Sequence, residues 1–206
     1  DNIELIFEIA NLSAQIQSLN IQIEEISIFL PFQPQSREEL KIAVDRWVAN
    51  PQNGNYLYGH ITDWDTSVVT DMSGLFYGYT MFNANVSDWD TSSVTNMSNI
   101  FAGATNFNQD ISDWDVSKVT DMRGMFASAY NFNQDISGWD TSSVTNMESM
   151  FYEAEIFDAE ISSWDVSSVT DMSSMFRLAE SFNHDISNWN VSNVTTMSYM
   201  FYDAIS

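Results

Sequence analysis

Cysteine is absent from the 206-residue chain, and basic residues are few. A chain without cysteine has no disulfide, no thiolate metal site and no cysteine nucleophile. Six Lys and Arg stand against 29 Asp and Glu, which gives a formal charge of −23 at pH 7. Such an acidic chain repels phosphate backbones and anionic bilayers. The charge balance therefore argues against a protein that binds nucleic acid or a membrane surface.

Long apolar runs are also lacking. No stretch of the sequence approaches the roughly 18 continuous apolar residues of a membrane span. No basic segment followed by an apolar run opens the chain, as it would in a secretion signal. The sequence begins at Asp1 without Met, and its last repeat stops at Ser206. We therefore expect a processed or excised segment, or a last repeat whose face meets another molecule.

What the chain does contain is a repeat of 25 residues, present six times between residues 59 and 206. Four apolar positions recur in each unit without a slip, and chance does not explain four registers in phase. The positions are Trp64, Trp89, Trp114, Trp139, Trp164 and Trp189; Val69, Val94, Val119, Val144, Val169 and Val194; Met72, Met97, Met122, Met147, Met172 and Met197; and Phe76, Phe101, Phe126, Phe151, Phe176 and Phe201. One unit cannot bury these side chains alone, so the pattern predicts stacked coils that share one core.

The period changes within each unit. Met97, Ile100, Phe101 and Ala104 have the spacing of a short amphipathic helix, with Thr95 as its N-cap. Residues 107–114 read as a short strand whose inward side chains are Phe107, Ile111 and Trp114, and residues 115–118 read as a turn. These patterns predict an α/β repeat solenoid in which each of six coils has one short strand and one short helix.

Residues 36–58 precede the repeats and have another pattern. Ser36 and Glu39 form a capping box, so a helix is expected to start there and to stop near Asn50 and Pro51. We expect residues 36–58 to be an N-terminal capping helix and connection that covers the first coil, while the C-terminal coil has no such cap. Residues 31–35 contain two prolines and are expected to form a stiff linker.

Residues 1–30 are expected to form a stalk helix. Apolar residues alternate four and three positions apart, which indicates a coiled-coil seam. Ile and Leu alternate along most of this seam, which favours a parallel dimer; Ile26 at a d position weakens that preference, and apolar residues beside the seam leave a trimer open. An ordinary amphipathic helix packed on the solenoid is the simpler alternative. The seam residues are Leu5, Ile9, Leu12, Ile16, Leu19, Ile23, Ile26 and Leu30.

The repeat resembles a known family. The segment from Phe107 to Ser117, Phe-Asn-Gln-Asp-Ile-Ser-Asp-Trp-Asp-Val-Ser, is followed by Val-Thr-Asp-Met and Met-Phe at residues 119–122 and 125–126. It closely resembles the BspA-like bacterial surface-protein repeat, also described as a mycoplasma lipoprotein repeat. The resemblance covers residues 59–206 and implies a leucine-rich-repeat-like solenoid displayed on a surface. The family brings no catalytic residues to carry over, and this chain lacks its lipoprotein cysteine.

One acidic column is a candidate metal site. Asp65, Asp90, Asp115, Asp140 and Asp165 follow successive tryptophans. Adjacent coils lie about 5 Å apart if their backbones pair, and like charges at that distance repel by roughly 1 kcal/mol in water. Either each carboxylate accepts N–H bonds from its own turn, or Ca²⁺ lies between coils. No other cofactor is indicated.

Catalysis has no support in the sequence. Serines are abundant, but no general base has a place beside them, and the chain has only two histidines. We therefore expect a non-enzymatic structural or assembly protein of an extracellular, cell or virion surface, fibre or appendage. It would oligomerise through the stalk and contact neighbouring structural proteins, or copies of itself, through solenoid faces that include the C-terminal coil. The alternative is an adhesin-type module that binds a host protein or a glycan.

Overall fold

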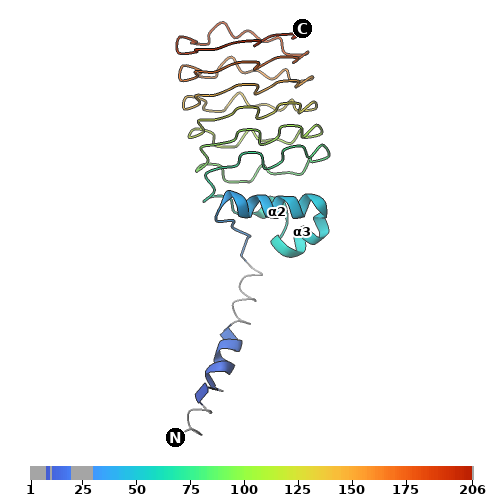
Figure 1. Ribbon diagram of the computed structural model, residues 1–206, viewed down its shortest axis with the longest axis vertical. Helices are drawn as coiled ribbons and strands as arrows, with labels where there is room; N and C mark the ends of the chain where they lie inside the picture. The colour runs from blue at the N-terminus through green and yellow to red at the C-terminus, as the bar shows by residue number, and fades with distance from the viewer. Residues whose placement is uncertain (1–7, 10, 20–29, 206) are drawn as a thin grey trace. The chain divides into compact units, whose positions relative to one another are not determined.

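The 25-residue period of the sequence becomes a stack of coils in the computed structural model, which describes residues 8, 9, 11–19 and 30–205. The chain divides into two units, Asp1–Phe32 and Gln33–Ser206. In the first unit, residues 8, 9 and 11–19 are helical. In the second unit, two helices are followed by six coils, which Figure 1 shows as successive turns of one rising chain. We number the coils 1 to 6 by their tryptophans, from Trp64 to Trp189.

Helix α2, Arg37–Ala49, begins where the capping box predicts. The Ser36 hydroxyl accepts the Glu39 N–H at 3.2 Å, and a Glu39 carboxylate oxygen accepts the Gln35 N–H at 2.9 Å. Leu40, Ala43 and Val44 form the fully buried face of α2. Figure 1 shows α2 lying across the end of the coil stack, which confirms that this helix covers the first coil.

A second helix, α3 (Pro51–Tyr58), was not predicted. Asn50 ends α2 in an extended conformation and also caps α3, because its side chain accepts the Asn53 N–H at 3.2 Å. Proline stops a preceding helix, but it is well suited to the first turn of the next one. The one-turn 3-10 helix η1, Ile61–Asp63, then leads into Trp64.

The predicted helix and strand of each coil are wrong for the described coils. Residues 97–103 form consecutive turns, with left-handed backbone at Asn99 (φ 55°) and Gly103 (φ 70°), and residues 107–114 form no strand. The parallel pairing between coils consists of single bridges, which lie earlier in the unit, as at Asn96 and Asp121. A left-handed residue every fourth position breaks an α-helix, so the stretch with helical spacing is not a helix.

Hydrogen bonds between coils explain this backbone. The N–H groups of residues 97, 99, 101 and 103 donate to the carbonyls of residues 121, 123, 125 and 127 in the next coil, over 2.7–3.0 Å. A helix would have used the same donors within its own coil. Thr95 is likewise no N-cap, because its N–H and its hydroxyl both donate to the Thr70 carbonyl of the preceding coil. The result is a repetitive, solenoid-like fold with few helices and almost no strands in its described part.

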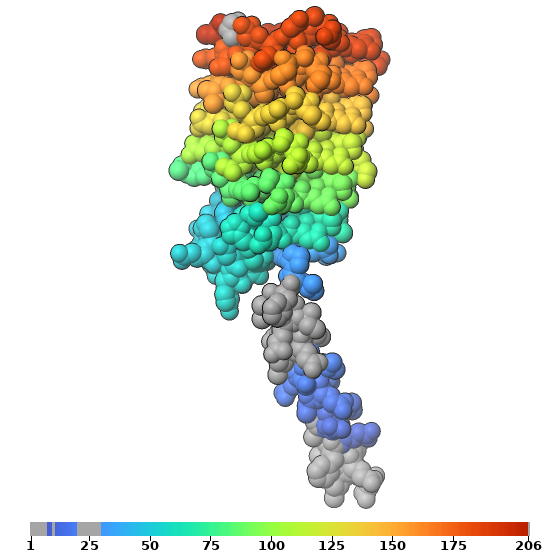
Figure 2. Space-filling model, turned by 180° about the vertical axis from the view of Figure 1, so that it is seen from behind, coloured from blue at the N-terminus to red at the C-terminus, as the bar shows by residue number. Residues whose placement is uncertain are grey.

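The core is a set of aromatic columns that run through the stack, as the sequence period predicts. Phe76, Phe101 and their equivalents stack with ring centroids 5.3–5.8 Å apart from one coil to the next. A second column, from Phe82 to Phe182, has spacings of 5.9–6.2 Å. Phe107, Ile111 and Trp114 are buried as expected. Figure 2 shows the coils as successive layers of the second unit.

Candidate functional site

The seam of the stalk helix is exposed wherever the structure describes it. Ile9, Leu12, Ile16 and Leu19 are 52–57% exposed, and Leu30 is 66% exposed. Leu5, Ile23 and Ile26 lie outside the described residues. Isoleucine and leucine side chains gain roughly 1.5–3 kcal/mol each when they are fully buried. A helix that presents four such side chains along one face therefore has a strong drive to associate.

The acidic column after the tryptophans is held by local hydrogen bonds. Each of its five carboxylates accepts the backbone N–H of the serine two residues later, over 2.9–3.1 Å. At Asp65 and Asp115 the serine hydroxyl also donates, at 2.6 Å. The serine hydroxyl, and then the serine N–H, lower the pKa of Asp65, Asp115 and Asp165 below its ordinary value. The local interpretation of this column is thus confirmed as geometry.

The calcium interpretation of the same column stays a prediction. Within residues 8, 9, 11–19 and 30–205, no group of three or more His, Asp or Glu is arranged to hold a metal ion. One lone pair of each carboxylate is used by its own turn, but the other carboxylate oxygen is free to bind elsewhere. At Asp65 that second oxygen accepts the Gln33 side-chain amide at 2.6 Å.

Two more acidic columns make the same turn, and sequence reasoning missed them. Asp71 and Asn96 represent the first, and Asp110 and Asp135 represent the second; each accepts an N–H from the residue two positions later. The Ser112 N–H and hydroxyl lower the pKa of Asp110 in the same way. The signal was available, since an Asp or Asn two residues before a serine recurs three times per unit. Every coil therefore has three side-chain-capped corners.

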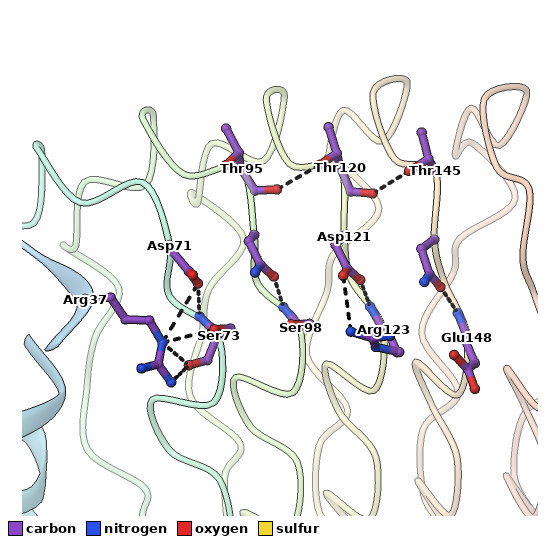
Figure 3. A network of polar contacts seen from close by, with 12 residues as sticks. Arg37, Asp71, Ser73, Thr95, Ser98, Thr120, Asp121, Arg123, Thr145 and Glu148 are labelled. Atoms are coloured by element: carbon purple, nitrogen blue, oxygen red, sulfur yellow. Dashed lines mark hydrogen bonds and ion pairs between the residues drawn. The ribbon is translucent and has the colours of Figure 1, made fainter.

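The first coil is joined to α2 by a polar network, shown in Figure 3. In each coil the carbonyls that face the N-terminal end accept N–H groups of the preceding coil, and coil 1 has no preceding coil. Arg37 takes this place, because its Nε and Nη2 donate to the Ser73 carbonyl at 2.9 and 2.6 Å. Its Nε also donates to the Ser73 hydroxyl at 3.0 Å and lies 4.0 Å from the Asp71 carboxylate. The guanidinium thus ends the backbone ladder.

A second network lies beside it. The Tyr79 hydroxyl donates to the Asp45 carboxylate at 2.6 Å, and Lys41 of α2 pairs with the same carboxylate. The Lys41 ammonium lies 5.2 Å from the centre of the Tyr79 ring. Burial, together with the bond to Asp45, raises the pKa of the Tyr79 hydroxyl. These contacts orient α2 and have no feature of a catalytic site.

The sixth coil presents an exposed face. Met197 is 40% exposed and Phe201 is 50% exposed, whereas their equivalents in the five earlier coils are fully buried. The N–H groups of Met197 and Tyr199 have no hydrogen-bond partner within the described residues, although Met172 and Ser174 donate to this coil. Such a face can accept another layer that presents backbone carbonyls.

No helix within the described ranges is both long and apolar enough to cross a bilayer. No curated protein and no solved structure matches the chain. One family does match, over residues 49–157 and again over residues 130–206, and it is described as a Mycoplasma protein of unknown function, DUF285. These matches include all six coils and the end of α2. The chain therefore belongs to this DUF285 family of Mycoplasma proteins.

Proposed function

We propose that this chain is a non-enzymatic structural protein of an extracellular surface, fibre, appendage or virion. Its stalk helix brings copies of the chain together, and the faces of its coils contact neighbouring proteins. The observation that supports this best is the exposed seam, in which Ile9, Leu12, Ile16 and Leu19 are each more than half exposed. An apolar stripe at this spacing is typical of a helix that associates with copies of itself.

The coils suit a scaffold for contact. Their interior is filled by stacked aromatic side chains, and their polar corners are satisfied by local hydrogen bonds. Several copies held together by a stalk would present several solenoid faces at once, and repeated weak contacts then gain avidity. The exposed sixth coil is a further contact face for a neighbouring protein or a second copy.

We also infer that the repeat is a BspA-like, leucine-rich-repeat-like unit and that it acts at a surface. The support is the motif from Phe107 to Ser117 together with the strict 25-residue period. The single parallel bridges between coils are a minimal form of the pairing that such solenoids use.

The oligomeric state of the full chain tests the proposal. Sedimentation equilibrium should give a dimer or a trimer, and the double variant Ile9→Ser/Ile16→Ser should be monomeric with an unchanged melting temperature of the coils. The matched control is Ile42→Ser, because Ile42 is 51% exposed but lies on α2, away from the seam. A parent chain that stays monomeric at every concentration would contradict the stalk. A monomer that binds a glycan array or a host protein tightly would support the adhesin alternative instead.

A further inference from the structure

A groove of about 550 Å³ lies between the two helices and coil 1. Trp47, Val48 and Pro51 line it from the helix side, and residues 78–84 line it from the coil side. Met81 is 80% exposed, while Phe82 is almost buried at 4%. The volume lies in the range of roughly 300–1,000 Å³ that ligand-binding pockets have.

The coil side of the groove is a backbone edge that other coils use for pairing. At the position equivalent to Met81, the N–H groups of Asn106 and Asn131 donate to the Thr80 and Thr105 carbonyls of the preceding coil, both at 3.1 Å. At the position equivalent to Asn83, the N–H groups of four later coils donate to a side-chain oxygen of the preceding coil over 2.8–3.1 Å. That oxygen belongs to Asn83, Asn108, Asn133 or Asp158.

In coil 1 these two donors have no such acceptors. Within the described residues, the N–H groups of Met81 and Asn83 make no hydrogen bond. The chain 25 residues earlier, residues 55–58, belongs to α3, and a helix uses its own carbonyls internally. The groove therefore exposes two donors at a fixed spacing, next to an apolar wall.

We propose that this groove binds an extended segment of a second polypeptide that carries the sequence Thr-x-Phe-Asn. The threonine carbonyl would accept the Met81 N–H, and the asparagine side chain would accept the Asn83 N–H. The template is Thr105–Asn108 of this chain, whose Phe107 ring lies 5.9 Å from Phe82 and 6.0 Å from Phe132. The phenyl group of the bound segment would reach Trp47 and the Phe82 side of the groove.

Charge selects asparagine over aspartate in the bound segment. The chain carries a formal charge of −23, and a neutral carboxamide oxygen accepts the same hydrogen bond without adding repulsion. Addition of an extended segment to an open backbone edge is a common mode of peptide recognition, in which the main chain supplies affinity and the side chains supply specificity. This binding does not depend on the stalk.

A peptide titration tests the proposal on the full chain. The probe is the acetylated, amidated hexapeptide Ala-Thr-Asn-Phe-Asn-Gln, which copies residues 104–109. In amide NMR spectra of the labelled protein, the Met81 and Asn83 signals should shift downfield as the peptide is added. Peptides with alanine in place of the second asparagine or of the phenylalanine should bind at least about fivefold more weakly, since each loses one of the paired contacts.

Protein variants provide the second arm. Met81→Glu places a charge in the groove at an exposed position and should abolish the shifts. The control Tyr77→Glu should not, because Tyr77 is 65% exposed and does not line the groove. The proposal is overturned if no shift occurs at 5 mM peptide, if the alanine peptides bind equally well, or if the shifts fall on residues 197–203 of the sixth coil instead.

Discussion

The indole Nε1–H of Trp114 donates a hydrogen bond to the carbonyl oxygen of Val86, 28 residues earlier, at 3.0 Å. The same bond joins each tryptophan from Trp89 to Trp189 to the coil before it, over 2.8–3.2 Å. These indoles are 3–8% exposed. A buried carbonyl that loses its partner costs roughly 1–3 kcal/mol, so each tryptophan both fills the core and joins two coils through a polar contact.

Trp114→Phe should lower the free energy of unfolding by about 2–4 kcal/mol, because it leaves the Val86 carbonyl without its donor and opens a small cavity. Urea titration followed by far-UV circular dichroism measures the change. The control Tyr77→Phe alters an exposed ring and should stay within about 0.5 kcal/mol of the parent chain. Equal stability of the Trp114 variant and the parent would show that the indole bond adds nothing.

Thr141 offers a cleaner test of a single hydrogen bond. Its buried hydroxyl donates to the Asp165 carbonyl at 2.9 Å, and Thr141→Val removes the bond with little change of shape. We expect a loss of about 1–2 kcal/mol in the free energy of unfolding. The chain contains the reverse case, since Val116 is the buried equivalent residue. Val116→Thr should be neutral or slightly stabilising, because its hydroxyl can reach the Asp140 carbonyl. A large loss for Val116→Thr would contradict this account.

The acidic corners should make the fold sensitive to low pH. Hydrogen bonds from Ser117 lower the pKa of Asp115 below its unfolded value. The stability from these bonds is therefore present above the unfolded pKa, near 3.9, and is lost as the pH falls through the lower folded pKa. Ser117→Ala removes the hydroxyl donor and should raise the pKa of Asp115 in an NMR titration. Ser163→Ala should leave that pKa unchanged, because the Ser163 hydroxyl donates to the Ser137 carbonyl. A Ser117 variant with the parent's Asp115 pKa would refute the assignment.

The two interpretations of the acidic column differ in their response to calcium. Because each Asp is already held by its own serine, we expect millimolar CaCl₂ to raise the melting temperature no more than NaCl of equal ionic strength. Differential scanning calorimetry of the full chain measures both. A clearly larger shift with calcium, lost in an Asp90→Asn/Asp115→Asn variant, would establish ions between the coils instead.

Sequence reasoning recovered those features that depend on a residue's position in the period. The burial of Phe107, Ile111 and Trp114, the start of α2 after Ser36 and the turn at Asp115 were all predicted from local pattern. It failed at residues 97–104, where apolar spacing predicted a helix. That spacing reports which side chains face inward, and a chain of tight turns can place the same side chains inward.

By itself, the sequence determined that six equivalent units share one apolar interior, because identical side chains every 25 residues can be buried only against one another. Only the tertiary structure decided where the backbone donors go. The Met97 N–H finds its acceptor at Asp121 in the next coil and not within its own. That choice depends on carbonyls brought close by stacking, which local propensity does not contain. For the same reason, the free donors of Met81 and Asn83 became visible only once the coils were stacked and α3 had taken the place of a preceding coil.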